Sequence, residues 1–383
     1  MKSHLLTLVF LASFLSLMSQ DLPAEEKKLS FNASGFINLN AILDFNGLED
    51  YDDFTTSQIP INPSPYQNMF RFHMTARQSR LNFGINYNTP WGKLKGFVSG
   101  DFYSGNEGII SRFRLREAYF EIGNLLLGQT NTTMGNPDVV PTTVDFQGPN
   151  SATTLRNPMI RYSSKIGKGW SYILAIEMRG GDISPFKKTG KPFTFIPTLV
   201  GNINKEGDWG VVTLSAMSDI TSYFYADSVT GSGIVKKAKV GYGGALSAII
   251  NTWKKDHFSI FYIAGKGVAN FISDLSGLGY NGMPDYATKE LMLLSSMGGF
   301  IAYTHYWDDK FSSNIIYSYV NLEKTDLLAD TAFKSSNYAL INLFYSPFER
   351  LNFGVEYIWG ELFVQDNENG TANCLQFLAQ FKF

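Results

Sequence analysis

The C-terminal stretch Ala372-Asn-Cys-Leu-Gln-Phe-Leu-Ala-Gln-Phe-Lys-Phe383 alternates between apolar and polar residues up to the end of the chain. Side chains of an extended strand point to opposite faces in turn. One face then carries Leu375, Phe377, Ala379, Phe381 and Phe383, and the other carries Cys374, Gln376, Gln380 and Lys382. A terminal aromatic residue of a soluble chain usually frays into water. The pattern therefore predicts that Phe383 completes an apolar band on one face of the last strand.

This ending resembles the closing strand of bacterial outer-membrane β-barrels, whose barrel assembly machinery recognises a C-terminal Phe such as Phe383. The composition fits that class. Charged residues make up 17% of the chain and aromatic residues 15%, whereas soluble domains carry about 25% charged residues. The single cysteine, Cys374, excludes a disulfide framework. Lysine and arginine form no long runs, so we expect no nucleic acid partner.

Residues 1–20 combine a charged start, with Lys2 and His4, and an apolar run from Leu5 to Met18. This pattern is typical of a cleaved secretory signal peptide, and the run is too short for a spanning helix. We expect cleavage near residues 19–21 and one mature barrel domain over residues 21–383. The expected location is the outer membrane of a Gram-negative bacterium, in contact with its lipid.

Period-two alternation, broken by turn residues, predicts sixteen antiparallel strands along the chain. The predicted strands are residues 29–46, 70–88, 92–104, 112–122, 124–131, 157–165, 169–180, 192–204, 208–225, 235–253, 256–272, 290–308, 310–323, 335–347, 350–364 and 371–383. Seven connections between them are short, and eight are longer and irregular. A closed sixteen-stranded barrel needs seven short periplasmic turns and eight external loops. The predicted fold is therefore all-β, a transmembrane antiparallel β-barrel.

The tryptophans support this orientation. Five of the six lie in or beside short turns: Trp91, Trp170, Trp209, Trp253 and Trp307. Indole rings gather at membrane interfaces, so these residues are expected to form a periplasmic girdle. The alternative is a set of aromatic plugs at the end of a soluble β-sandwich, which does not need a tryptophan at most of its turns.

Nine of the ten arginines lie between residues 71 and 179. Arginine facing lipid at mid-depth costs about 2 to 4 kcal/mol, so we place these side chains in the lumen, with phase changes that predict bulges near Gln78 and after Arg116. The predicted pore-lining basic wall comprises Arg71, Arg77, Arg80, Arg112, Arg114, Arg116, Arg161 and Arg179. Such a wall favours anions. The alternative is that the arginines pair with the lumenal acids Glu117, Glu121 and Glu177 and only stiffen the barrel.

The third long connection, residues 132–156, contains three prolines, several apolar residues and two acids. A loop with so many apolar residues is not expected to extend into water. We expect it to fold into the barrel and form a constriction with Asp138, Asp145 and Arg156. Its acids would then face the arginines across the pore. Packing of the loop on a neighbouring subunit is the alternative.

Several of these segments resemble the DcaP-like porin family. They are Arg77-Gln-Ser-Arg-Leu-Asn-Phe-Gly84, the run Arg112 to Glu121, Gly128-Gln-Thr, Val144-Asp-Phe-Gln-Gly-Pro149, Arg156 to Tyr162 and Ala175-Ile-Glu177. The resemblance implies a homotrimeric sixteen-stranded porin that passes small anionic solutes, dicarboxylates among them, by diffusion. It is strongest between residues 70 and 180. The segment from Asp21 to Lys28 is too short for the N-terminal coiled coil that some members carry.

Other functions make different demands on the sequence. A phosphate-selective porin would need a ladder of lysine and arginine, whereas the lysines are scattered apart from Lys187, Lys188 and Lys191. A barrel hydrolase would need a nucleophile and an acid placed with a histidine, and no such spacing accompanies His73 or His305. An adhesin barrel would be distinguished from a porin by the absence of ion conductance. We therefore expect no enzymatic activity, no metal and no cofactor.

Overall fold

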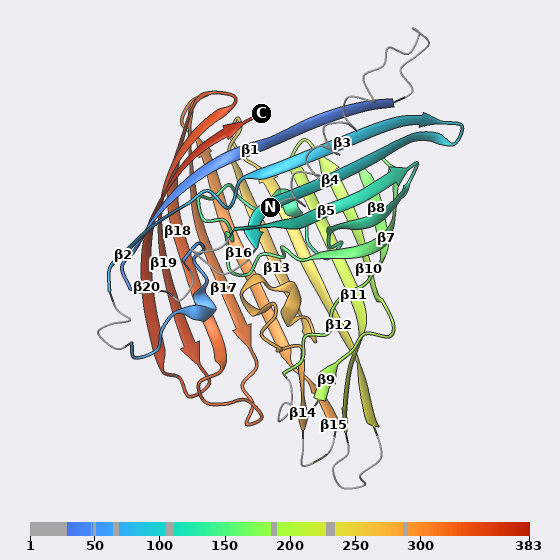
Figure 1. Ribbon diagram of the computed structural model, residues 1–383, viewed down its shortest axis with the longest axis vertical. Coiled ribbons are helices and arrows are strands. Elements are labelled where there is room, and N and C mark those ends of the chain that lie inside the picture. Colours follow the sequence, from blue (N-terminus) through green and yellow to red (C-terminus); the bar gives the residue numbers. More distant parts are fainter. Residues whose placement is uncertain are drawn as a thin grey trace, which may run out of the picture.

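The computed structural model describes residues 29–46, 48, 51–63, 69–104, 111–184, 190–226, 234–285, 288 and 290–383. The expected signal peptide, residues 1–20, lies outside these ranges. Within them, antiparallel strands form a β-barrel (Figure 1). None of the helices in the described ranges has the length and apolar character that a membrane-spanning helix needs.

The described part of the chain contains twenty β-strands. They are β1 (Leu29–Asp44), β2 (Arg71–Thr75), β3 (Arg80–Thr89), β4 (Gly92–Ser104), β5 (Arg112–Ile122), β6 (Leu125–Asn131), β7 (Arg156–Gly167), β8 (Trp170–Glu177), β9 (Gly190–Pro192), β10 (Thr198–Gly207), β11 (Gly210–Ala226), β12 (Ile234–Asn251), β13 (His257–Lys266), β14 (Gly282–Asp285), β15 (Glu290–Leu293), β16 (Ser295–Tyr306), β17 (Phe311–Leu322), β18 (Phe333–Phe348), β19 (Leu351–Val364) and β20 (Asn369–Lys382). The 3-10 helices in the same ranges are η1 (Thr56–Gln58), η2 (Pro137–Val139), η4 (Ala269–Phe271) and η5 (Ser273–Leu275).

These strands occupy sixteen positions around the barrel in the described residues. β2 and β3 both pair with β1 and share one position, and β9 and β10 both pair with β11 and share another. β14 and β15 form a separate hairpin. The last strand, β20, pairs with β1, from Phe36 opposite Lys382 to Asp44 opposite Cys374. This pairing joins the first strand to the last and closes the barrel.

The predicted sixteen strands, seven short turns and eight longer connections are confirmed. Both predicted bulges are present as well. Residues 76–79 interrupt the strand between β2 and β3, and Arg116 is an extra residue between Leu115, which lies opposite Gly100, and Glu117, which lies opposite Ser99. The strand predicted over residues 256–272 ends at Lys266, because the chain then folds into η4 and η5. The β14–β15 hairpin was not predicted.

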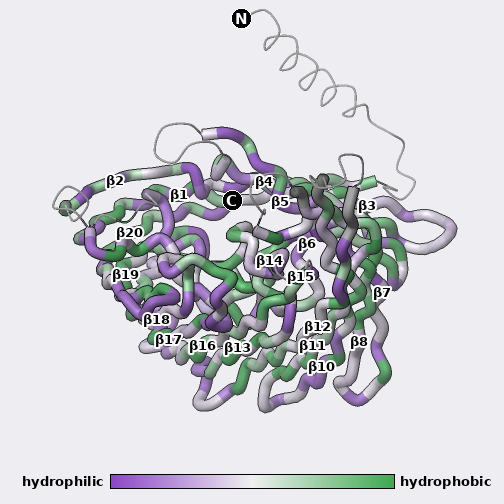
Figure 2. Tube along the Cα trace, turned by 90° about the horizontal axis from the view of Figure 1, so that it is seen from below, coloured by the Kyte–Doolittle hydropathy of each residue, from purple (hydrophilic) through white to green (hydrophobic). Residues whose placement is uncertain are grey.

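The two faces of the wall have opposite character. On β20, Cys374 and Gln376 are buried, whereas Phe377 and Phe381 are 41% and 43% exposed. The two-faced last strand is thus confirmed. Figure 2 shows the alternation of hydrophilic and hydrophobic residues along the wall, seen from the end at which β14 and β15 lie. Apolar side chains therefore face the surroundings, whereas the inner face of the wall carries buried polar side chains together with buried apolar ones such as Ile316, Val320 and Ile358.

The five tryptophans expected in the girdle lie beside short turns and are exposed. Their exposed fractions are 85% for Trp91, 42% for Trp170, 44% for Trp209, 69% for Trp253 and 65% for Trp307. The C-terminus lies at this end of the barrel, whereas β9, β14 and β15 lie at the opposite end (Figure 1). An exposed indole ring is suited to a membrane interface, where its apolar body and polar N–H both find partners.

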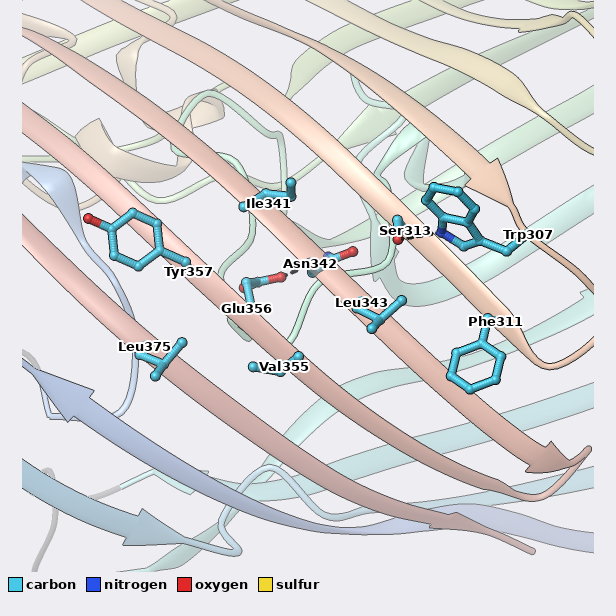
Figure 3. Close-up of a pocket in the computed structure, with 10 residues that line it drawn as sticks. All are labelled: Trp307, Phe311, Ser313, Ile341, Asn342, Leu343, Val355, Glu356, Tyr357 and Leu375. Carbon is cyan, nitrogen blue, oxygen red and sulfur yellow. Dashed lines mark hydrogen bonds between the residues drawn. The ribbon is translucent and has the colours of Figure 1, made fainter.

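A shallow apolar hollow of about 660 Å³ lies on the outer face of β17 to β20 (Figure 3). Ile341 and Tyr357, from β18 and β19, line it and are exposed. Their sequence neighbours Asn342 and Glu356 are buried on the lumenal side, where Asn342 Nδ2 donates to Glu356 Oε2 at 2.9 Å. Period-two alternation thus separates the lipid-facing hollow from the polar interior.

We predict that the cost of a charge on this outer face depends on depth. Ile341 lies near the middle of β18 and Phe348 at its end, and both are exposed. Ile341→Arg should lower the free energy of unfolding in lipid by about 2 to 4 kcal/mol, and Phe348→Arg, the matched control, by about 0 to 1 kcal/mol. Equilibrium unfolding in guanidinium measures both values. Equal costs would contradict the assignment of the outer face.

Candidate functional site

The segment 132–155, which connects β6 to β7, lies inside the barrel. Its first residues hydrogen-bond to the β8 side of the wall, where Glu177 accepts from the Thr133 backbone N–H at 2.7 Å and from the Thr132 hydroxyl at 2.6 Å. Further along, the Thr142 carbonyl accepts from Asn314 on β17 and from Asn342 on β18, at 2.9 and 3.0 Å. The segment therefore crosses the lumen from one wall to another.

The second half of the segment is attached to the wall and to other loops. Glu356 on β19 accepts from the backbone N–H groups of Val144 and Asp145, at 2.9 and 2.8 Å. Asn150 Nδ2 donates to the Ser336 hydroxyl on β18 at 2.9 Å, and the Ser151 and Ser318 hydroxyl oxygens lie 2.7 Å apart. Buried donors and acceptors are satisfied by these bonds, which hold the segment in place.

Two cavities lie between this segment and the wall. One, of about 320 Å³, is lined mainly by uncharged polar residues of β13 and β16 to β20, such as Asn314 and Gln380. The other, of about 440 Å³, lies towards β6 to β8 and β10, β11, and includes Arg161 and Glu206. Asp138 borders both cavities and is exposed. Of the two acids of the segment, Asp138 is thus the one that faces open space.

Five of the predicted wall arginines form ion pairs with aspartates. The pairs are Arg71 with Asp44 (2.9 Å), Arg77 with Asp52, Arg114 with Asp101 (2.8 Å), Arg116 with Asp101 (2.6 Å) and Arg179 with Asp219. The partners are therefore aspartates and not the glutamates Glu117, Glu121 and Glu177 suggested by the sequence. Glu177 instead binds the start of the segment, and Glu121 lies 3.7 Å from Lys95.

The three remaining wall arginines, and Arg156 of the predicted constriction, have no ion pair with an acid among the described residues. Arg156 donates to the Thr154 carbonyl at 3.2 Å, Arg161 donates to the Thr133 hydroxyl at 3.1 Å, and the Arg80 guanidinium lies over the Phe36 ring at 5.2 Å. Arg112 is exposed. These four cations keep charge that the structure does not neutralise directly.

The two bulges explain how so many charges share one region. Because residues 76–79 break the alternation, Arg77 and Arg80 both face inward, and Arg80 lies opposite Asp101. Because Arg116 is the extra residue of its bulge, Arg116 and Glu117 both face inward, and Glu117 accepts from the Thr130 hydroxyl at 2.6 Å. Alternation without bulges would have sent one residue of each pair into lipid.

Arg80, Arg114, Arg116 and Arg156 interact electrostatically with one another and with Asp101 and Glu117. We name these four arginines the arginine cluster. Four guanidinium groups share two carboxylates there, so the cluster has an excess of two positive charges. Guanidinium groups bind carboxylates in a planar two-point geometry. The cluster is therefore suited to attract small anions.

Phe146 joins the lumenal segment to the arginine cluster. Its ring lies 4.9 Å from the ring of Tyr103 on β4, and the Arg116 guanidinium lies 5.3 Å from its centroid. Tyr103 in turn lies beneath Arg77 and Arg114, at 5.1 and 5.0 Å. Tyr103 was not singled out from the sequence, although its position two residues after Asp101 places it on the same inward face.

The expectation that Asp145 faces the arginines is wrong. Asp145 is 1% exposed and accepts hydrogen bonds from the Phe54 backbone N–H and the Tyr338 hydroxyl, at 3.1 and 3.0 Å. Its carboxyl lies beside other acids, Asp53 and Glu356. Asp145 is thus buried against β18 and β19, with no arginine nitrogen within 4.0 Å of its carboxyl among the described residues.

Two histidines have acid partners that the sequence did not reveal. His73 lies 3.0 Å from Asp52, and His305 lies 2.7 Å from Asp256. Asp52 also binds Arg77, and Asp256 also accepts from the Tyr303 hydroxyl at 2.9 Å, so both acids are held in structural networks. No group of three or more His, Cys, Asp or Glu side chains in the described ranges is placed to hold a metal ion.

The family model described as DcaP outer membrane protein matches residues 15–383. No match was found among curated protein sequences.

Among solved structures, the outer membrane channel DcaP of Acinetobacter baumannii has a TM-score of 0.78 at 18% identity, covering 94% of this chain and 99% of that one. An anion-selective porin from Comamonas acidovorans has a TM-score of 0.59 at 10% identity, covering 93% and 100%. The trimer form of OmpT from Vibrio cholerae has a TM-score of 0.54 at 13% identity, covering 92% and 100%. The chain belongs to the DcaP outer membrane protein family and is a protein of the Gram-negative outer membrane.

Proposed function

We propose that this protein is a passive diffusion channel that prefers small hydrophilic anions, with dicarboxylates as its solutes. The observation that carries the proposal is the arginine cluster, in which four guanidinium groups share the carboxylates of Asp101 and Glu117. The segment 132–155, which crosses the lumen, places Phe146 against this cluster. Fold and charge thus support passage of anions without any chemical reaction.

The dicarboxylate preference is supported by the presence of several guanidinium groups in one cluster. Arg80 and Arg156 have no acid partner among the described residues, whereas Arg114 and Arg116 share Asp101. A solute with two carboxylates can contact two guanidinium groups at once, which a monovalent anion cannot do. The structural likeness to an anion-selective porin from Comamonas acidovorans agrees with this choice.

A phosphate-selective channel is the second candidate. The cluster would also attract phosphate, because guanidinium binds both anions. Lys187 and Lys188, which could recruit anions at the mouth, lie outside the described residues. We further propose a homotrimer and recognition of Phe383 by the barrel assembly machinery. Trimer formation is supported by the likeness to the trimer form of OmpT.

We predict that succinate competes with chloride for the channel through Arg80 and Arg156. Adding succinate should reduce the chloride current of the wild type in planar bilayers. In the double variant Arg80→Ala/Arg156→Ala the reduction should be several-fold weaker, since a charge about 4 Å from an ion is worth about 1 kcal/mol even in water. Succinamide, which is uncharged, should have no effect on either protein.

The matched control for this experiment is Arg350→Ala. Arg350 is the remaining arginine of the chain and is exposed at the turn between β18 and β19. This variant should respond to succinate as the wild type does. Equal inhibition of the wild type and the double variant would contradict the dicarboxylate assignment, and stronger inhibition by phosphate than by succinate would favour the second candidate.

We also predict that the lumenal segment limits the current. Replacing residues 138–147 by a short Gly-Ser linker removes Thr142, Val144 and Asp145, which attach the segment to β17, β18 and β19. Single-channel conductance should rise because the path widens. Conductance equal to that of the wild type would show that the narrowest part of the path lies elsewhere.

A further inference from the structure

Three buried carboxyls join the lumenal segment to other parts of the barrel. They belong to Asp145, Asp274 and Glu356, which are 1%, 2% and 1% exposed. We name these three residues the carboxyl latch. None of them has a nitrogen of Lys, Arg or His within 4.0 Å in the described ranges, unlike Asp44, Asp52, Asp101 and Asp219. A buried ionised carboxylate without a cation is costly.

Each carboxyl of the latch bridges two or more elements. Asp145 binds the Phe54 backbone N–H and the Tyr338 hydroxyl, and Glu356 binds the backbone N–H groups of Val144 and Asp145. Asp274 in η5 accepts from the Ser57 backbone N–H at 2.9 Å, from Gln147 Nε2 at 2.8 Å and from the Thr56 hydroxyl. The latch thus ties η1, η5 and the segment 144–147 to β18 and β19.

The titratable groups that face the latch are acids or neutral side chains. Asp145 faces Asp53 and Glu356, and the Tyr338 hydroxyl faces Asp145, Glu356 and Asp274. From β20, the Cys374 thiol faces Asp145, Glu356 and Asp44. Ionisation of all these acids would therefore bring several negative charges together in a buried space. Their mutual repulsion is stronger there than in water, because the local dielectric constant is lower.

Burial is the main cause that raises the pKa of Asp145 well above its usual range, and the neighbouring Asp53 and Glu356 add to it. Burial also raises the pKa of Asp274 to about 7, against the hydrogen bonds from Thr56, Ser57 and Gln147, which lower it. Both aspartates are therefore protonated in the attached segment over part of the pH range in which a free carboxyl is ionised.

We propose that the carboxyl latch holds the segment 144–152 against the wall while its carboxyls carry protons, and that rising pH releases the segment and changes the current. The inference rests on the proposed channel function. It assigns to the lumenal segment a second conformation, reached by release from β18 and β19. Protons are then the ligand that selects between the two conformations.

The direction of the pH effect follows from linkage. A carboxyl whose pKa is higher in the attached state than in the released state binds more protons when attached, so attachment is favoured at low pH. The pKa of Asp274 is raised from its ordinary value of 3.8 to about 7, so the stabilisation of the attached segment by protonated Asp274 is lost as the pH rises between these two values. Within that window the ratio of attached to released segment should fall about tenfold per pH unit for each titrating carboxyl.

Single-channel recording between pH 5 and pH 8 tests the proposal. In the wild type, the fraction of time spent in a second conductance level should rise from pH 5 to pH 7. The triple variant Asp145→Asn/Asp274→Asn/Glu356→Gln keeps an oxygen acceptor at each position, and none of the three side chains can ionise, so its recordings should not depend on pH. Asp138→Asn is the matched control, because Asp138 is an exposed acid on the same segment. This control should keep the pH dependence of the wild type.

A second variant tests movement of the segment without touching the acids. The Ser151 and Ser318 hydroxyl oxygens lie 2.7 Å apart, so the double variant Ser151→Cys/Ser318→Cys places two thiols within reach of a disulfide. Oxidation should abolish the second conductance level at every pH, and reduction should restore it. Heat-modified migration on gels verifies that each variant has folded as a barrel.

Persistence of the pH-dependent level in the oxidised Ser151→Cys/Ser318→Cys protein, or in the Asp145→Asn/Asp274→Asn/Glu356→Gln protein, would overturn the latch. Wild-type recordings that do not change with pH would also overturn the latch, but they would not contradict the proposed function as an anion channel. Absence of any conductance in the wild type would instead overturn the proposed channel function and, with it, this inference.

Discussion

The hydrogen bonds between β1 and β20 are the constraint on which the other features of this molecule depend. Lipid offers no partner to an open strand edge, so a sheet in the membrane must close on itself. Nine residue pairs, from Phe36 opposite Lys382 to Asp44 opposite Cys374, complete that closure. Once the barrel is closed, period-two alternation sends one set of side chains into lipid, where they are apolar, and the other set inward, where both polar and apolar residues lie. The chemistry of the interior follows from what these inward positions carry.

The inward positions carry more charge than a closed interior tolerates without partners. The arginines of β2, of the bulge after it, of β5 and of the residues just after β8 therefore form ion pairs with aspartates. These aspartates come from nearby strands and from the first loop, as in Arg77 with Asp52 and Arg179 with Asp219. Only part of the charge is neutralised in this way. The arginine cluster keeps a positive excess beside Phe146, while the carboxyl latch ties the adjoining residues 144–147 of the same segment to β18, β19 and η5.

Much of this architecture could be predicted from the sequence because strand alternation and turns are local. The strands and turns, and even the bulges after Ala76 and at Arg116, appear as breaks in a period of two. The partners of the arginines could not be predicted in the same way. Asp52 reaches Arg77, and Asp145 reaches Tyr338, only because the closed barrel brings together residues that are 25 and 193 positions apart. Tyr103 could have been found from alternation alone, since it follows Asp101 on the same face.

The arrangement of charge in the lumen follows from the closed barrel, and it makes a preference for anions directly measurable. The zero-current potential of the purified wild-type protein in a planar bilayer, across a gradient of potassium chloride, tests it most directly. An anion-preferring channel should give a zero-current potential of the sign set by chloride flux. A potential of the sign set by potassium flux would contradict it and would show that acids such as Asp138 dominate the path.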